Sequence, residues 1–130
     1  MQWDGLNRRR FVRVQYPFTV HIYLPDRPPI STYTEDVSEG GIKVTVRENI
    51  PLEVSVDLEI YLRSEPIICK GKVTWVGERI SQYLEGVKLY DTGFEFFKVK
   101  EVDKKIIKKH VKELLKVKKE EQAKDGSESS

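Results

Sequence analysis

The 130-residue sequence predicts an all-β fold, an antiparallel barrel or sandwich, with one helix at the C-terminal end. Between residues 18 and 97, apolar and polar residues alternate in short segments separated by turn residues, which is typical of half-buried strands. No helical period interrupts these segments, so neighbouring strands are expected to pair antiparallel. From residue 101, apolar residues recur every three or four positions, which indicates an amphipathic helix.

The strand segments are bounded by residues that turn the chain. The cleanest alternation spans residues 54–62, where every second residue is aliphatic. The proline-rich stretch at residues 25–29 and the Ser-Glu-Gly-Gly of residues 38–41 are typical of turns. Strands are therefore predicted at residues 18–24, 30–37, 42–46, 54–62, 67–76, 83–89 and 94–97.

The patterns divide the chain into four segments. Residues 1–16 lack apolar periodicity and are predicted to form a flexible N-terminal arm, followed by the barrel at residues 17–98. Residues 99–120 are predicted to form the helix, whose N-terminal end suits the acidic Glu101 and Asp103. Residues 121–130 are small and polar, so a disordered tail is expected there.

The net charge of +2 is unevenly distributed, and the composition excludes several classes of protein. Residues 1–100 hold 14 basic and 14 acidic side chains, whereas residues 101–119 hold eight lysines against three acids. No apolar run reaches the roughly 20 residues of a membrane-spanning helix, and no signal peptide follows Met1, so a cytoplasmic protein is expected. One cysteine and two distant histidines argue against a disulfide and a metal site.

Four arginines lie within six positions of the N-terminal arm, and they are the first candidate binding residues. They are Arg8, Arg9, Arg10 and Arg13. The planar guanidinium group matches phosphate oxygens, or the O6/N7 edge of guanine, through two parallel hydrogen bonds. Taken alone, the same cluster is also compatible with a solvated basic terminus that binds nothing in particular.

The turn after the second predicted strand is the second candidate. Asp36 and Ser38 are two residues apart, so their side chains share a face if the backbone is extended there. Carboxylate and hydroxyl oxygens can accept hydrogen bonds from guanine, and Gly40 and Gly41 permit positive φ and close approach of the backbone. An ordinary turn would have the same composition.

Together, the two segments resemble the paired motifs of the PilZ family. Arg9-x-x-x-Arg13 precedes the first strand, and Asp36-x-Ser38-x-x-Gly41 follows the second. The similarity continues in Gly71-Lys72-Val73-Thr74-Trp75-Val76, which resembles the family's G-x-V-x-W strand, and in Gly93-Phe94-Glu95-Phe96, which resembles its closing strand. Each motif is weak alone, but four in this order indicate a PilZ-like domain over about residues 8–97.

The resemblance implies a six-stranded antiparallel barrel with a C-terminal helix, and a receptor for cyclic di-GMP. By the same resemblance, Arg9 and Arg13 would hold phosphates and guanine edges, while Asp36 and Ser38 would bind a guanine. Gly41 would keep the turn open to the ligand, and Arg8 would influence whether one nucleotide or an intercalated pair is bound.

Three further residues are weaker candidates. Trp75 either lines the base or belongs to the core, and Arg10 either adds positive charge or faces solvent. Gly40 accompanies Gly41 in the turn.

We hypothesise that residues 1–13 close over the nucleotide and that the closed form signals to an unidentified protein partner. No cofactor besides this ligand is expected. Two alternatives remain: a degenerate PilZ scaffold that binds only protein, or a small barrel that binds single-stranded nucleic acid. The neutral barrel segment argues against the nucleic-acid reading. An enzyme is not expected, since no base accompanies Ser38 in the sequence and no phosphate-loop or dinucleotide fingerprint is present.

Overall fold

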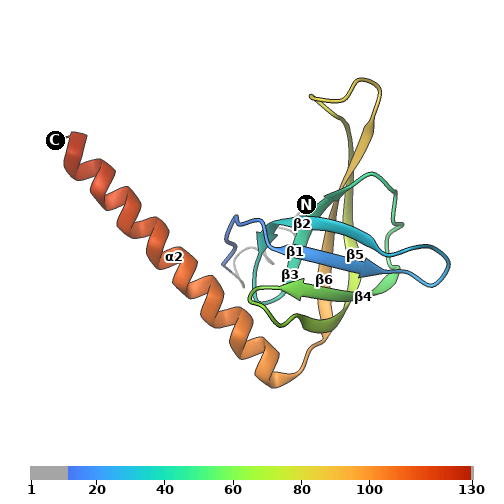
Figure 1. Ribbon diagram of the computed structural model, residues 1–130, viewed down its shortest axis with the longest axis horizontal. Coiled ribbons are helices and arrows are strands. Elements are labelled where there is room, and N and C mark those ends of the chain that lie inside the picture. Colours follow the sequence, from blue (N-terminus) through green and yellow to red (C-terminus); the bar gives the residue numbers. More distant parts are fainter. Residues whose placement is uncertain (1–11, 130) are drawn as a thin grey trace.

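The computed structural model describes the backbone of residues 12–129 and the side chains of residues 12–117. Within this range, six antiparallel strands form a closed barrel in the order β1-β2-β3-β6-β5-β4, and helix α2 leads away from one end of it (Figure 1). The predicted fold class is therefore confirmed. The bounds are β1 Thr19–Tyr23, β2 Ile30–Val37, β3 Gly41–Val46, β4 Ser55–Tyr61, β5 Ile67–Ile80, β6 Lys88–Lys98 and α2 Glu101–Ser129.

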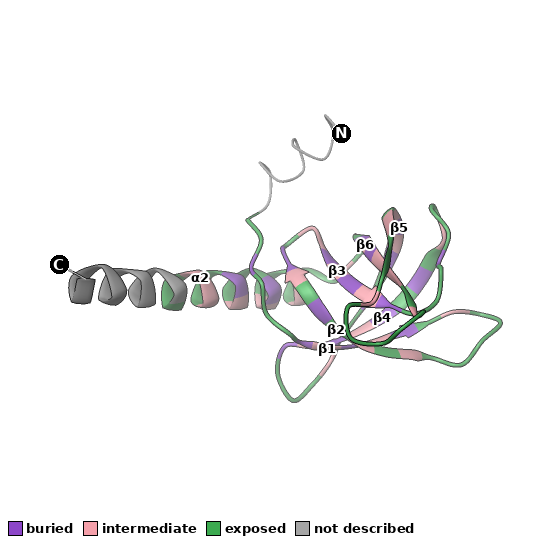
Figure 2. Ribbon diagram, turned by 90° about the horizontal axis from the view of Figure 1, so that it is seen from above, coloured by how far each residue is buried: buried purple, intermediate pink, exposed green. Residues whose placement is uncertain are grey.

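Alternation along the strands places one face of each strand in a single core. Val20 and Ile22 of β1 are buried, while their neighbours are partly buried or exposed, and β4 repeats the pattern. Buried positions, purple in Figure 2, recur along the strands, and their side chains form one hydrophobic cluster. Cys69 belongs to this core, where desolvation by burial raises the pKa of its thiol to about 12. It is a packing residue, because the reactive thiolate form is strongly disfavoured.

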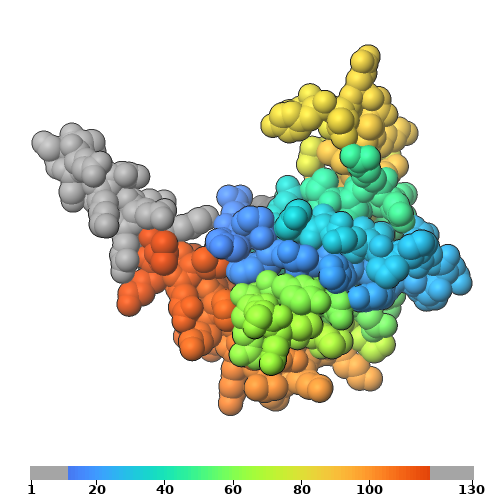
Figure 3. Space-filling view, in the orientation of Figure 1, coloured from blue at the N-terminus to red at the C-terminus, as the bar shows by residue number. Residues whose placement is uncertain are grey.

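The β5–β6 hairpin differs from the sequence prediction. β6 begins at Lys88, so the strand predicted at residues 83–89 is wrong, and residues 94–97 are the C-terminal part of β6. The hydroxyl of Ser81 accepts hydrogen bonds from two backbone N–H groups of the turn, and Gly86 has a φ of 74°. These local interactions turn the chain where apolar residues alone indicated a strand. The space-filling view shows the hairpin tip, in yellow, projecting from the body of the barrel (Figure 3).

The chain before β1 is fixed to the barrel at Val14. Val14 and Val37 exchange two backbone hydrogen bonds of 2.9 Å, and the Val14 side chain is buried. The hydroxyl of Thr34 also donates to the carbonyl of Tyr16. The predicted flexible arm of residues 1–16 therefore does not extend to Val14, because this apolar side chain belongs to the core. Residues 1–11 lie outside the described part of the chain.

Helix α2 packs against the barrel through its first turns. Ile107 is 1% exposed and Val111 is also buried, while Val102 is 61% exposed. The apolar stripe therefore covers an end of the barrel. The backbone is helical to Ser129, which differs from the tail predicted from residue 121; residues 120–124 are Glu, Gln, Ala and Lys, which have high helix propensity. No helix in the described residues is long and apolar enough to cross a membrane.

Candidate functional site

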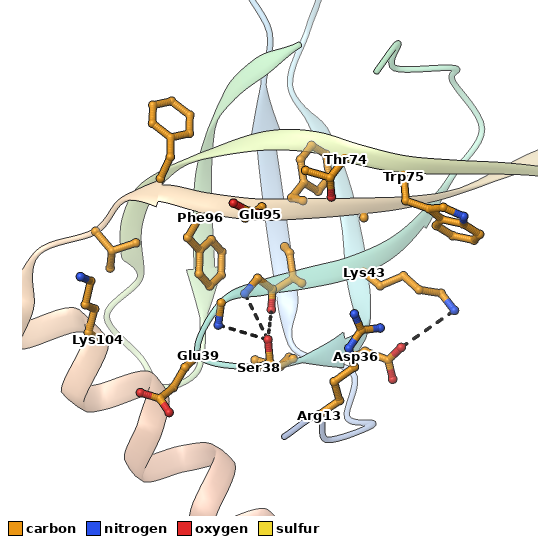
Figure 4. A pocket seen from close by; sticks show the side chains of 18 of the residues that line it. Arg13, Asp36, Ser38, Glu39, Lys43, Thr74, Trp75, Glu95, Phe96 and Lys104 are labelled. Carbon is orange, nitrogen blue, oxygen red and sulfur yellow. Dashed lines mark hydrogen bonds and ion pairs between the residues drawn. The ribbon is translucent and has the colours of Figure 1, made fainter. Parts of the chain in front are cut away.

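A pocket of about 910 Å³ lies on the barrel wall where the β2–β3 turn, β5 and β6 approach the start of α2 (Figure 4). Six of the candidate residues identified in the sequence line it: Arg13, Asp36, Ser38, Gly40, Gly41 and Trp75. The structure thus brings the second motif together with the last arginine of the first. The other three candidates, Arg8, Arg9 and Arg10, lie outside the described residues.

The bridge between Val14 and Val37 places Arg13 beside Asp36. Because the bridge is antiparallel, Arg13 lies opposite Ser38 and diagonally across from Asp36, so Arg13 and Asp36 project to the same side of the two chain segments, on the pocket wall (Figure 4). The Arg13 side chain is exposed and makes no ion pair with another described residue. The Asp36 side chain is 17% exposed, and its Oδ2 lies 3.9 Å from Nζ of Lys43. The guanidinium group of Arg13 and the carboxylate of Asp36 therefore face the same pocket.

Ser38 organises the turn between β2 and β3. Its Oγ accepts hydrogen bonds of 3.2 Å from the backbone N–H groups of Gly40 and Gly41, and it donates to the Gly41 carbonyl at 3.3 Å. These three bonds use the one donor and two acceptor positions of a hydroxyl group. Ser38 is only 7% exposed. Any bond from Ser38 to a ligand must therefore replace one of the bonds that shape the turn.

Gly41 allows β3 to approach β6 closely. A Cβ atom at this position would lie 2.0 Å from the carbonyl oxygen of Phe94, far inside normal contact distance. Neither Gly40 nor Gly41 has a positive φ, since Gly86 is the glycine with that conformation among the described residues. Of the two properties that glycine permits here, the turn therefore uses the close approach of the backbone and not the positive φ.

Trp75 lies on the pocket wall and is 38% exposed, so it is not a core residue. A β-bulge between Val73 and Trp75 shifts the register of β5, which moves Trp75 out of phase with the buried Val73. The indole lies over two glycines: a Cβ at Gly77 would come within 3.0 Å of its ring, and one at Gly93 within 3.5 Å of its Cβ. This arrangement leaves one surface of the indole facing the pocket (Figure 4).

Sequence reasoning missed several charged residues of the pocket. Lys43, Glu95 and Lys104 come from three different elements, β3, β6 and α2, and line the pocket with Glu39 of the turn. Gly41 pairs with Glu95 across the β3–β6 ladder, a register that no motif reveals. The sequence gives a weak indication that Lys43 lines the site, because Lys43 lies two residues after Gly41 and therefore on the same face of the strand.

A charged network lies beside the pocket on the outer face of the barrel. Arg79 donates a 2.9 Å hydrogen bond from Nε to Oδ2 of Asp91, and the Thr45 hydroxyl contacts Oδ1 at 2.7 Å. Burial raises the pKa of Asp91, but the bonds from Arg79 and Thr45 outweigh this and hold the pKa below its ordinary value of 3.8. Asp91 is therefore a structural carboxylate that is ionised at neutral pH.

The sequence matches the family model of the PilZ domain over residues 7–113, which is most of the chain. The chain belongs to the PilZ domain family. The PilZ match includes both motif segments and the first turns of α2. Among curated proteins, none gives a significant match.

Three solved structures share this fold. The PilZ domain with c-di-GMP of YcgR from Escherichia coli has 18% identity and a TM-score of 0.70, and the match covers 90% of this chain and 98% of that one. YcgR in complex with c-di-GMP has 15% identity and a TM-score of 0.64, and the match covers 95% of this chain and 51% of that one. The Bacillus subtilis inhibitor of motility, MotI/DgrA, has 21% identity and a TM-score of 0.65, and the match covers 80% of this chain and 49% of that one. This PilZ chain thus spans about half the length of the MotI/DgrA chain and of the YcgR chain in the second structure.

Proposed function

We propose that this PilZ-family protein is a receptor for cyclic di-GMP that acts as an adaptor. The observation that carries the proposal is the convergence of Arg13 and Asp36 on one pocket, together with the turn formed by Ser38. Guanidinium groups match phosphate oxygens and guanine edges, and a carboxylate accepts from the N–H groups of guanine. The similar YcgR structures contain c-di-GMP, which supports the same ligand here.

The charge of the pocket supports closure of the N-terminal arm over the ligand. Its described lining holds four basic residues and three acidic ones, namely Arg13, Lys43, Lys98 and Lys104 against Asp36, Glu39 and Glu95. One excess positive charge does not balance the two phosphates of cyclic di-GMP. Arg8, Arg9 and Arg10 would supply three more charges once residues 1–13 close, with Val14 as the fixed end.

Arm closure requires that the ligand bind the closed form more tightly than the open one. Ordering each arm residue costs about 1–2 kcal/mol, so several charge-assisted bonds from the arginines are needed to offset it. The closed arm would present a surface that a protein partner recognises, and signalling would follow from that contact. Hydrogen exchange of residues 1–13 with and without saturating nucleotide measures closure; equal exchange rates in the two states would refute it.

Calorimetric titration with cyclic di-GMP tests the receptor function. We expect saturable binding by the wild type, no heat with GTP, and at least a 100-fold loss of affinity in Arg9→Ala/Arg13→Ala, since each charge-assisted bond contributes about 1.5–3 kcal/mol. Arg27→Ala is the matched control, because Arg27 pairs with Glu48 on an exposed loop outside the pocket. The molar ratio separates one bound nucleotide from an intercalated pair.

Two outcomes would replace this proposal. No heat, with no NMR shifts on titration, would leave a PilZ scaffold that binds only protein. Binding to single-stranded polynucleotides that falls steeply with salt, without cyclic di-GMP binding, would indicate a nucleic-acid function.

A further inference from the structure

We infer that Lys43 is a specificity-determining residue of the pocket and that its ammonium group reads O6 of a guanine held by Asp36. This inference rests on the proposed binding of cyclic di-GMP and adds a residue outside both family motifs. Lys43 is on β3 and lines the pocket, and its side chain extends between Asp36 and Trp75 (Figure 4).

The strand register places these side chains in one row on the outer face of the barrel. Asp36 pairs with Lys43 across β2 and β3, Lys43 pairs with Gly93 across β3 and β6, and Gly93 pairs with Trp75 of β5. Directly opposed residues of antiparallel strands point to the same face of a sheet. Because Gly93 has no side chain, Lys43 and Trp75 are adjacent, with Nζ 5.7 Å from the centre of the indole ring.

The polar atoms of this row are close to each other but do not satisfy each other. Nζ of Lys43 lies 3.9 Å from Oδ2 of Asp36, which is beyond hydrogen-bond distance. Lys43 donates no hydrogen bond to any other described residue. The Lys43 side chain is only 33% exposed and the Asp36 side chain 17% exposed, so both are partly removed from water. An ammonium donor and a carboxylate acceptor are thus held side by side at the pocket wall.

This pair complements the Watson–Crick edge of guanine. That edge carries an acceptor, O6, next to two donors, N1–H and the exocyclic amine. A carboxylate accepts from the two donors, and an ammonium group donates to O6. Adenine places an amine where guanine has O6, so its donor would face the donor of Lys43. A base that leaves buried polar groups unpaired is rejected, which is how such sites gain specificity.

The indole of Trp75 supports this arrangement from the other side. Nζ of Lys43 lies over the indole ring, and this cation–π contact helps to hold the ammonium group beside Asp36. Gly77 lets the indole lie close to the barrel, because a Cβ at that position would come within 3.0 Å of two ring atoms. The base therefore meets a donor and an acceptor at fixed positions.

The test compares the affinities of cyclic di-GMP and cyclic di-AMP for the wild type, Lys43→Met and Lys43→Arg. Cyclic di-AMP is measured by displacement of a fluorescent cyclic di-GMP analogue, which extends the range to weak binding. We expect Lys43→Met to bind cyclic di-GMP about 10- to 100-fold more weakly, as for loss of a charged hydrogen bond. Its affinity for cyclic di-AMP should be unchanged or higher, and Lys43→Arg should restore the preference for guanine.

Lys98→Met is the matched control, because Lys98 also lines the pocket and loses the same charge. It should weaken both nucleotides in the same proportion and leave their ratio unchanged. The inference is overturned if Lys43→Met also leaves the ratio unchanged, since Lys43 would then act only as a positive charge. It is equally overturned if Lys43→Met binds cyclic di-GMP more tightly, since Lys43 would then compete for Asp36. Failure of the wild type to bind cyclic di-GMP would instead refute the proposed function on which the inference depends.

Discussion

Replacing Gly41 with alanine is expected to destabilise the barrel strongly, independently of any ligand. The added Cβ would lie 2.0 Å from the Phe94 carbonyl oxygen, whereas ordinary van der Waals contact begins at 3.4 Å. Because the contacting atom belongs to the backbone of β6, no side-chain rotation relieves the clash. The start of β3 must therefore move away from β6 by more than 1 Å.

The size of the effect follows from the bonds that this movement disturbs. The hydrogen bonds from Phe96 N–H to the Gly40 carbonyl and from Ser38 N–H to the Gly41 carbonyl are both 2.9 Å and both lie at the displaced end. Losing two such bonds costs about 2 kcal/mol, and overpacking adds about 1–3 kcal/mol. We therefore expect a loss of about 3–5 kcal/mol in the free energy of unfolding, which for a domain of this size corresponds to a Tm lower by about 10–20 °C.

Urea and thermal unfolding, followed by circular dichroism without nucleotide, measure this loss. Gly86→Ala is the control: its φ is 74° and nothing lies within 4 Å, so only backbone strain of about 1–2 kcal/mol is expected. If Gly41→Ala were no less stable than Gly86→Ala, the close approach of β3 and β6 would not be required. The glycine of the motif would then have to be explained by the ligand alone.

Two further predictions concern stability. Ionised Asp91 stabilises the folded state above about pH 4, and this contribution is lost as pH falls through the lowered folded-state pKa. Asp91→Asn should therefore be less stable than the wild type at pH 7, with a difference that shrinks towards pH 2; a constant difference would contradict the pairing with Arg79. Ile107→Ala should cost about 2–4 kcal/mol because its side chain is buried between α2 and the barrel, while Val102→Ala should change stability by less than about 0.5 kcal/mol. Equal effects of the two substitutions in urea unfolding would show that α2 does not pack as described.

The first four strands could be predicted because β1, β3 and β4 alternate with a period of two and because turn residues bound β2, whose own period is shifted by a bulge between Thr34 and Asp36. β2, for example, has the predicted bounds, since the chain turns at the prolines before it and at the Ser38 turn after it. The bounds of the β5–β6 hairpin could not be predicted, because the residues of the Ser81 turn resemble a strand in composition. The hydrogen bonds that form this turn are local. The sequence does not predict the β-bulge before Trp75 either, because alternation alone would place Trp75 in phase with Val73, in the core.

The candidate site was predictable only in part. Motif spacing identified Arg13, Asp36 and Ser38, and the Val14 bridge explains why residues so distant in sequence meet. Glu95 and Lys43 depend on the register between strands, and Lys104 depends on where α2 packs, so local sequence holds little information about them. The saturated hydrogen bonding of Ser38 is likewise a property of the folded turn.

The position of Trp75 gives the molecule an optical reporter inside its own pocket. The chain has two tryptophans, Trp3 and Trp75, and they fall in different parts of the proposed binding event, the arm and the barrel wall. A Trp3→Phe variant would emit only from the pocket, and a Trp75→Phe variant only from the arm. Stopped-flow fluorescence of the two variants could therefore time nucleotide arrival and arm closure separately, without any attached dye.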